Sequence, residues 1–154
     1  MDNIFKDLCQ YILDNTYNEI TTEKIENEFN YSKYYLIRIF KTYTGYTIKE
    51  FINTVKILRT IDPLIFTNDT ILKIALNGGF NSQEYYSEKF QEIIGISPIK
   101  FRKEYSNIYF SCDVNELKSK KDYLMKLNNF HDYLVNIPNT LEKNSNAKKL
   151  IKKS

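Results

Sequence analysis

One set of side chains at helical spacing combines positive charge with aromatic and aliphatic groups. It comprises Lys33, Tyr34, Ile37, Arg38 and Lys41, which fall on one face of a helix and give it three positive charges. An arginine can donate two hydrogen bonds to guanine, and an apolar side chain such as Ile37 can contact a thymine methyl group. We interpret this face as a surface that contacts base edges in duplex DNA. The alternative is an ordinary solvent-exposed helix face with no binding role.

The distribution of charge supports the first interpretation without deciding it. Residues 32–60 contain six basic residues and one acidic residue, a net charge of +5, whereas residues 1–31 have a net charge of −5. Such a pattern can orient a protein toward a polyanion. Lys33 falls in the first turn of its predicted helix, where a cation is mildly unfavourable for the helix dipole. An external phosphate would explain a lysine at this position better than helix stability does.

The elements that hold these side chains repeat with a period of fifty residues. The paired positions are Ser32 and Ser82, Tyr35 and Tyr85, Phe40 and Phe90, Gly45 and Gly95, Thr47 and Ser97, and Phe51 and Phe101. The serines and threonine are typical helix N-caps, and the glycines are typical of helix C-terminal stops. Each repeat therefore predicts a short helix, a turn, a second helix, a glycine stop and a third helix, which contains a helix-turn-helix arrangement.

The predicted fold is all-α, with two helix-turn-helix units joined by a linker helix. The first unit spans about 4–46, the linker about 47–66 and the second unit about 68–105. The predicted buried stripes of the two second helices are Leu36, Ile39, Phe40 and Tyr43 in the first and Tyr86, Phe90 and Ile93 in the second. Pro63 falls inside the linker, so we expect a kink or an end near Ile61 and extended geometry at Asp62.

These motifs together resemble those of a known family. The first unit contributes the run from Tyr31 to Lys41 with Gly45 and Phe51-Ile52, and the second contributes Ile74-Ala75-Leu76, Gly79-Phe80, Tyr85-Tyr86-Ser87, Phe90, Gly95, Ser97-Pro98 and Arg102. The chain from about 4 to 105 resembles the DNA-binding domain of the AraC/XylS transcriptional regulators. The resemblance implies that the two second helices enter successive major grooves, about one turn (~34 Å) apart.

The resemblance also implies which residues contact DNA. The expected base contacts are Tyr34, Ile37, Arg38, Gln83, Glu84, Ser87 and Glu88. The expected phosphate contacts are Ser32, Lys33, Lys41, Lys49, Lys56 and Ser82. Three residues depart from the family pattern: Glu88 replaces the usual arginine, Gln91 replaces the usual lysine, and Pro63 interrupts the linker. The outward face of the second helix in the second unit, which carries Glu84 and Glu88, is therefore expected to bind DNA weakly and selectively, or to avoid it.

Residues 106–154 lie beyond the resemblance. Apolar residues at helical spacing predict an amphipathic helix from roughly 113 to 136, within a helical extension over 106–138. We favour packing of this helix on the body of the protein over a partner or dimer helix. Residues 139–154 are expected to form a basic disordered tail that adds non-specific attraction to DNA. The extension has fewer than 50 residues, too few for a convincing effector pocket, so the sequence gives no support for ligand sensing.

Several classes of protein do not fit this sequence. His131 is the only histidine, Cys9 and Cys112 lie far apart, and the Gly78-Gly79 pair is not a phosphate-binding loop. We therefore expect no enzyme, cofactor or metal site. No apolar run is long enough to span a membrane, and acidic residues stand where a signal peptide carries basic ones. The expected location is the cytoplasm, and no ligand-binding domain is expected before the first unit.

Two functional hypotheses remain open. The first is a monomeric, sequence-specific DNA-binding regulator, an activator that also touches RNA polymerase. The second is a protein-interaction module, a co-activator or anti-activator, that keeps the fold but binds DNA weakly. The acidic second face, Pro63 and the apolar extension favour this alternative.

Overall fold

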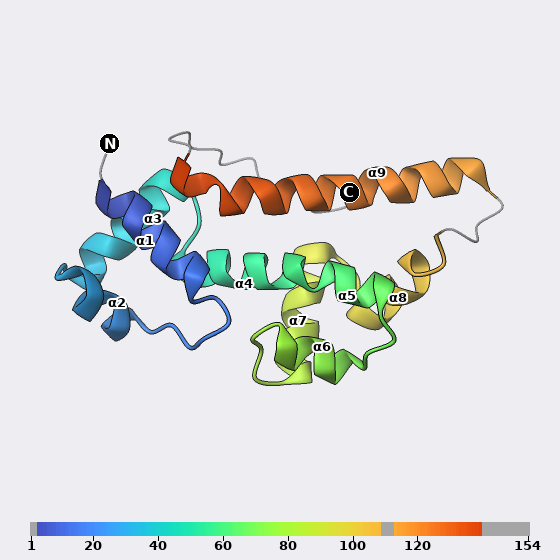
Figure 1. Ribbon diagram of the computed structural model, residues 1–154, viewed down its shortest axis with the longest axis horizontal. Helices are drawn as coiled ribbons and strands as arrows, with labels where there is room; N and C mark the ends of the chain where they lie inside the picture. The colour runs from blue at the N-terminus through green and yellow to red at the C-terminus, as the bar shows by residue number, and fades with distance from the viewer. Residues whose placement is uncertain (1–2, 109–112, 140–154) are drawn as a thin grey trace.

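The computed structural model describes residues 3–108 and 113–139, and its regular elements over these ranges are all helical (Figure 1). They are α1 (Asn3–Asp14), α2 (Thr22–Phe29), α3 (Lys33–Thr44), α4 (Ile48–Arg59), α5 (Ile61–Phe66), α6 (Ile71–Asn77), α7 (Gln83–Ile94), α8 (Pro98–Tyr105), α9 (Val114–Val135) and the 3₁₀ turn η2 (Ile137–Asn139). The predicted all-α fold is confirmed. The tail expected beyond residue 139 lies outside the described residues.

The paired caps of the fifty-residue repeat form as predicted. The Ser32 hydroxyl accepts the Tyr35 backbone N–H at 3.3 Å, and the Ser82 hydroxyl accepts that of Tyr85 at 3.1 Å. Gly45 follows α3 with a φ of 77°, and Gly95 follows α7 with a φ of 102°. Residues with a Cβ atom are disfavoured at these positive φ values, whereas glycine adopts them readily. The two glycines therefore end their helices at equivalent points. α3 and α7 are therefore equivalent helices in two similar units.

The buried side of each helix fixes which side faces outward. In α3, Leu36, Ile39 and Phe40 are buried, and half-buried Tyr43 packs on Phe5 with ring centroids 4.7 Å apart. The buried residues of α7 are Tyr86, Phe90 and Ile94. The predicted stripe is one residue off at its end, because Ile93 is only partly buried and Ile94 takes the core position.

The linker divides at Thr60 into α4 and α5, one residue from the predicted break. The prediction of extended geometry at Asp62 is wrong, because Asp62 lies in the first turn of α5. Pro63 is the third residue of α5, where a backbone N–H would have no partner within the helix, so proline is tolerated. The Thr60 hydroxyl donates to the Ile57 carbonyl at 2.7 Å and accepts the Tyr86 hydroxyl at 2.8 Å. The break is thus held in place by a buried contact with α7.

The long helix α9 runs beside α4 and α5 and reaches both units (Figure 1). Near its start, Lys120 donates to the Glu104 carbonyl of α8 at 2.7 Å. Its buried face consists of Tyr123, Leu127, Phe130 and Leu134. Beyond its end, the buried residues Ile137 and Pro138 bring η2 against α1. The extension therefore packs on the body of the protein and connects the two units on one side of the linker.

His131 on α9 makes the stability of this packing dependent on pH. Burial, and then the charge of Arg59, lower the pKa of His131 below its usual value. The unfolded chain therefore takes up a proton at a higher pH than the folded chain, and this contribution to stability is lost as the pH falls below about 6.5. Urea unfolding of wild-type protein should show a larger loss of stability between about pH 7.5 and about pH 5.5 than that of His131→Gln. Equal losses in both proteins would contradict this assignment.

Candidate nucleic-acid interface

The outward face of α3 presents its charges to solvent. Tyr34 is 72% exposed and Ile37 is 37% exposed, and Arg38 and Lys41 are exposed beside them. The side chains of Arg38 and Lys41 form no hydrogen bond or ion pair with any residue that the structure describes. Lys33 is half-buried, and its ammonium nitrogen lies 5.2 Å from the centre of the Tyr34 ring. This face is therefore a cationic surface with free hydrogen-bond donors.

The two capping serines, Ser32 and Ser82, lie at the starts of α3 and α7. Ser32 is exposed and Ser82 is half-buried, and the hydroxyl oxygen of each already accepts a backbone N–H of its own helix. A serine hydroxyl that accepts one hydrogen bond can still donate its own hydrogen. Phosphate contacts from these two residues remain predictions that this geometry permits.

The outward face of α7 has the opposite charge. Glu84 and Glu88 are exposed, and Gln83 and Ser87 are half-buried. The neighbouring Lys89 forms its ion pair with Glu92 instead, at 3.1 Å. Near a phosphate backbone two glutamates repel, although a glutamate can accept a hydrogen bond from cytosine. The two equivalent helices therefore offer DNA different surfaces.

The match to known proteins agrees with this arrangement of two units. The family model described as a helix-turn-helix domain matches residues 25–104, more than half of the chain. The chain belongs to the AraC/XylS family of DNA-binding transcriptional regulators. The matched residues run from α2 into α8 and include α3 and α7, so the part of this AraC/XylS member that lies outside the match includes α1 and α9.

Individual relatives cover the same part of the chain. The TetD protein of transposon Tn10 from Escherichia coli is 30% identical over 100 residues, which are 65% of this chain and 72% of TetD. The HTH-type transcriptional activator AarP of Providencia stuartii is 29% identical over 100 residues, 65% of this chain and 74% of AarP. A crystal structure of the DNA-binding domain of AdpA in complex with a target DNA has the same fold, with a TM-score of 0.62 at 19% identity over 68% of this chain and 94% of that one.

Metal binding, cysteine chemistry and membrane insertion find little support in the described residues of this AraC/XylS member. Over residues 3–108 and 113–139, no group of three or more histidine, cysteine, aspartate or glutamate side chains could hold a metal ion. Burial raises the pKa of the Cys9 thiol to about 12, so this cysteine is not a ready nucleophile. None of the described helices is both long enough and apolar enough to cross a membrane.

The linker lysines differ in their surroundings. Lys49 is exposed at the start of α4, as a phosphate contact requires. Lys56 is half-buried, and its ammonium donates to the Gly79 carbonyl at 2.9 Å and lies 5.5 Å from the centre of the Phe80 ring. Burial lowers the pKa of Lys56. Because its charge is engaged within the protein, we leave Lys56 out of the proposed phosphate-binding set.

Two side chains on α4 hold the second unit against the linker. Besides Lys56, the Asn53 amide donates to the Tyr85 hydroxyl at 3.2 Å. Gly79, the partner of Lys56, has a φ of 89° in the turn before α7. A cavity of about 850 Å³ lies beside these contacts, lined by residues of both units and of α4, among them Ile37 and Lys49. The sequence marked the glycine pair as a turn but gave no sign that Lys56 would reach it across 23 residues.

Removal of the Lys56 ammonium tests this contact. Lys56→Met keeps most of the side-chain length and should lower the free energy of unfolding by about 1–2 kcal/mol, because a charge-assisted hydrogen bond to a backbone carbonyl is lost. Urea unfolding provides the measurement. Lys49→Met is the matched control, and its exposed position should keep the change within about 0.5 kcal/mol. Equal stability of the two variants would show that the bond to Gly79 contributes nothing.

Proposed function

We propose that this AraC/XylS member binds a specific duplex sequence by inserting α3 into the major groove, and that it activates transcription. The observation that carries the proposal is the exposed α3 face, where Arg38 and Lys41 have no partner among the described residues. A free arginine beside an exposed aromatic and an exposed aliphatic group fits the base edges of that groove. The name of AarP as an activator supports the activating role.

Different residues of the first unit would supply affinity and specificity. Arg38 would donate to guanine, and Ile37 and Tyr34 would contact neighbouring base edges. Lys33, Lys41 and Lys49 would neutralise phosphates, which gives sequence-independent affinity that falls as salt rises. The hydroxyls of Ser32 and Ser82 would donate to phosphates at the starts of the two helices. These assignments divide the interface between base contacts that specify and phosphate contacts that position.

The second unit would contribute less affinity than the first and would add selectivity at a few base positions. Gln83 can pair with adenine, and Glu84 or Glu88 can accept from cytosine, with Ser87 between them. Because both carboxylates are exposed and unpaired among the described residues, every such contact must overcome repulsion from nearby phosphates. We therefore propose that α3 dominates recognition and that α7 discriminates among sites already held by α3.

A selection from a random duplex library at two salt concentrations, followed by footprinting of the selected sites, tests the proposal. We expect enrichment of one short motif at both salt concentrations and protection of a major-groove segment facing α3. Protection of a second segment about one helical turn (~34 Å) away would show that α7 also engages DNA. Retention of all sequences equally, with affinity that vanishes at the higher salt, would contradict sequence-specific binding.

A protein-interaction module is the alternative that the acidic α7 face favours. In that case α7 would contact a basic surface of another protein, such as RNA polymerase, and DNA would bind weakly or not at all. Absence of any DNA complex at low salt, together with a stable complex with purified polymerase, would favour this alternative. Gel filtration of the protein alone tests the expected monomeric state.

Reversal of the charge at Glu88 distinguishes repulsion from base reading. Glu88→Arg should tighten binding to the selected duplex and steepen the dependence of log affinity on log salt by about 1, because a new cation faces the phosphates. Titrations at several salt concentrations give the measurement. Asp122→Arg makes the same charge change at an exposed position on α9 and should leave the slope of log affinity against log salt nearly unchanged. Weaker binding of Glu88→Arg would instead show that Glu88 reads cytosine.

A further inference from the structure

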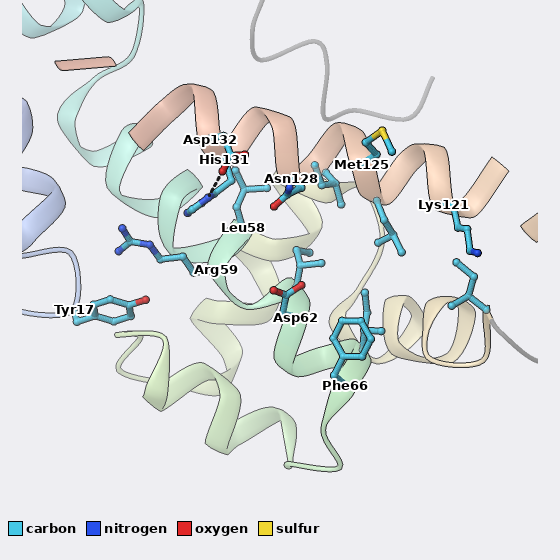
Figure 2. A pocket seen from close by; sticks show the side chains of 15 residues that line it. Tyr17, Leu58, Arg59, Asp62, Phe66, Lys121, Met125, Asn128, His131 and Asp132 are labelled. Atoms are coloured by element: carbon cyan, nitrogen blue, oxygen red, sulfur yellow. Dashed lines mark ion pairs between the residues drawn. The ribbon is translucent and has the colours of Figure 1, made fainter. Parts of the chain in front are cut away.

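A groove with a volume of about 800 Å³ lies between α9 and the linker helices α4 and α5 (Figure 2). Leu58 and Ile61 line it from the linker, and Leu124 and Leu127 line it from α9. None of its lining residues belongs to α3 or α7, so it is separate from the proposed DNA-binding faces. Its volume is within the range of about 300–1,000 Å³ that is typical of small-molecule sites.

Three exposed apolar side chains line this groove. Phe66 is 67% exposed, Met125 is 62% exposed and Tyr17 is 53% exposed, and all three line it. Figure 2 shows Phe66 and Met125 on the two sides of the groove, on α5 and α9, and Tyr17 at one end. Apolar groups gathered in one concave place mark a surface that a ligand would cover at a gain in free energy.

The side chains of Arg59 and His131 come together at the Tyr17 end of the groove, and each can form a further hydrogen bond. The Arg59 guanidinium donates one hydrogen bond, at 2.6 Å to the neutral hydroxyl of Thr16, and lies 5.2 Å from the centre of the Tyr17 ring. It pairs with no carboxylate of the described residues. The Nε2 atom of His131 is buried without a hydrogen-bond partner there. A carboxylate placed between them would accept from Arg59 and from the N–H of a neutral His131 whose proton is on Nε2.

The remaining charged groups of the groove disfavour a second negative charge in the middle of the ligand. Asp62 is exposed on α5 midway along the groove, and Asp132 lies on α9 with a carboxylate oxygen 3.6 Å from His131 Nδ1. Lys121 stands at the end opposite Arg59 (Figure 2). A second anionic group in the middle of a ligand would face Asp62, and a cation at the Tyr17 end would face Arg59.

We propose that this groove is a binding site for a small organic monocarboxylate with an apolar body, the carboxylate on Arg59 and His131 and the body between Phe66 and Met125. The extension alone does not form the site. Its lining comes from α9 and Ile108 together with Tyr17 and the linker helices, which explains why the length of the extension gave no sign of it. The proposal concerns binding only and does not depend on DNA recognition.

Titration of the full chain with 1-naphthoate, followed by calorimetry, tests the proposal. One molecule should bind per chain, at least about tenfold more tightly than neutral 1-naphthalenemethanol and than cationic 1-naphthylmethylamine, because only the carboxylate pairs with Arg59. Equal affinity for the neutral alcohol, tighter binding of the amine, or no binding of naphthoate up to roughly millimolar concentration would each overturn it.

Variants test where naphthoate binds and distinguish the loss of a binding contact from the loss of the fold. Arg59→Gln should weaken naphthoate binding at least about tenfold and leave that of the neutral alcohol unchanged. Because Arg59 also bonds to Thr16, a second variant is needed at an exposed position, and Met125→Glu should weaken naphthoate while leaving the amine as tight or tighter. Arg38→Gln on α3 is the control that should bind naphthoate like wild type. Unchanged naphthoate affinity in both groove variants would overturn the proposal.

Discussion

Phe130→Ala should lower the free energy of unfolding by about 3–5 kcal/mol, because truncation of a buried aromatic ring removes apolar contacts and leaves a cavity. Phe130 is 1% exposed on the face of α9 that packs into the common core. Urea unfolding followed by circular dichroism gives the measurement. Met125→Ala is the matched control on the same helix, where 62% exposure should keep the change within about 0.5 kcal/mol.

The same substitution should also affect DNA binding through the position of α9. This helix contacts the second unit through Lys120 and Glu104, and η2 beyond its end contacts α1 of the first unit. Weaker packing of α9 would let the two units move relative to each other. We expect Phe130→Ala to reduce affinity for a duplex that engages both α3 and α7 more than for one that engages α3 alone. If its stability matches that of Met125→Ala, α9 is not part of the cooperative core.

Local sequence patterns predicted most of the elements of this fold. Ser32 and Ser82 each accept a backbone N–H three residues ahead, and Gly45 and Gly95 each end a helix, so these signals need no knowledge of distant residues. The exposed face of α3 followed from the same logic, because the positions of Leu36 and Phe40 in the core determine which side chains face outward.

Contacts between distant residues were beyond the reach of these patterns. Lys56 carries the same charge as Lys49, and only the three-dimensional position of Gly79 shows that one is engaged internally and the other is not. The groove under α9 likewise depends on how the extension packs on the linker, which brings Arg59 and His131 together from positions far apart in the chain. At Asp62 the general preference of a residue before proline gave the wrong geometry, because the helix restarts just ahead of it.

Arg38→Ala should weaken binding to the selected duplex by about 1–3 kcal/mol, roughly a 5- to 150-fold loss, and relax the preference at one base position. The reason is that a bidentate contact to one guanine would disappear while the phosphate contacts remain. The variant should fold as wild type does, because the Arg38 side chain is exposed and bonds to nothing among the described residues. Titration of the selected duplex and of duplexes substituted at each position provides the measurement.

Two further variants of α3 separate base reading from charge. Arg38→Lys keeps the positive charge but cannot present two parallel donors to guanine, so it should keep the salt dependence of wild type and lack its base preference. Lys41→Ala should instead weaken all duplexes by a similar factor and reduce the slope of log affinity against log salt by about 1. If Arg38→Ala weakens every sequence equally, as expected of Lys41→Ala, then Arg38 binds phosphate and specificity must come from Tyr34, Ile37 or α7.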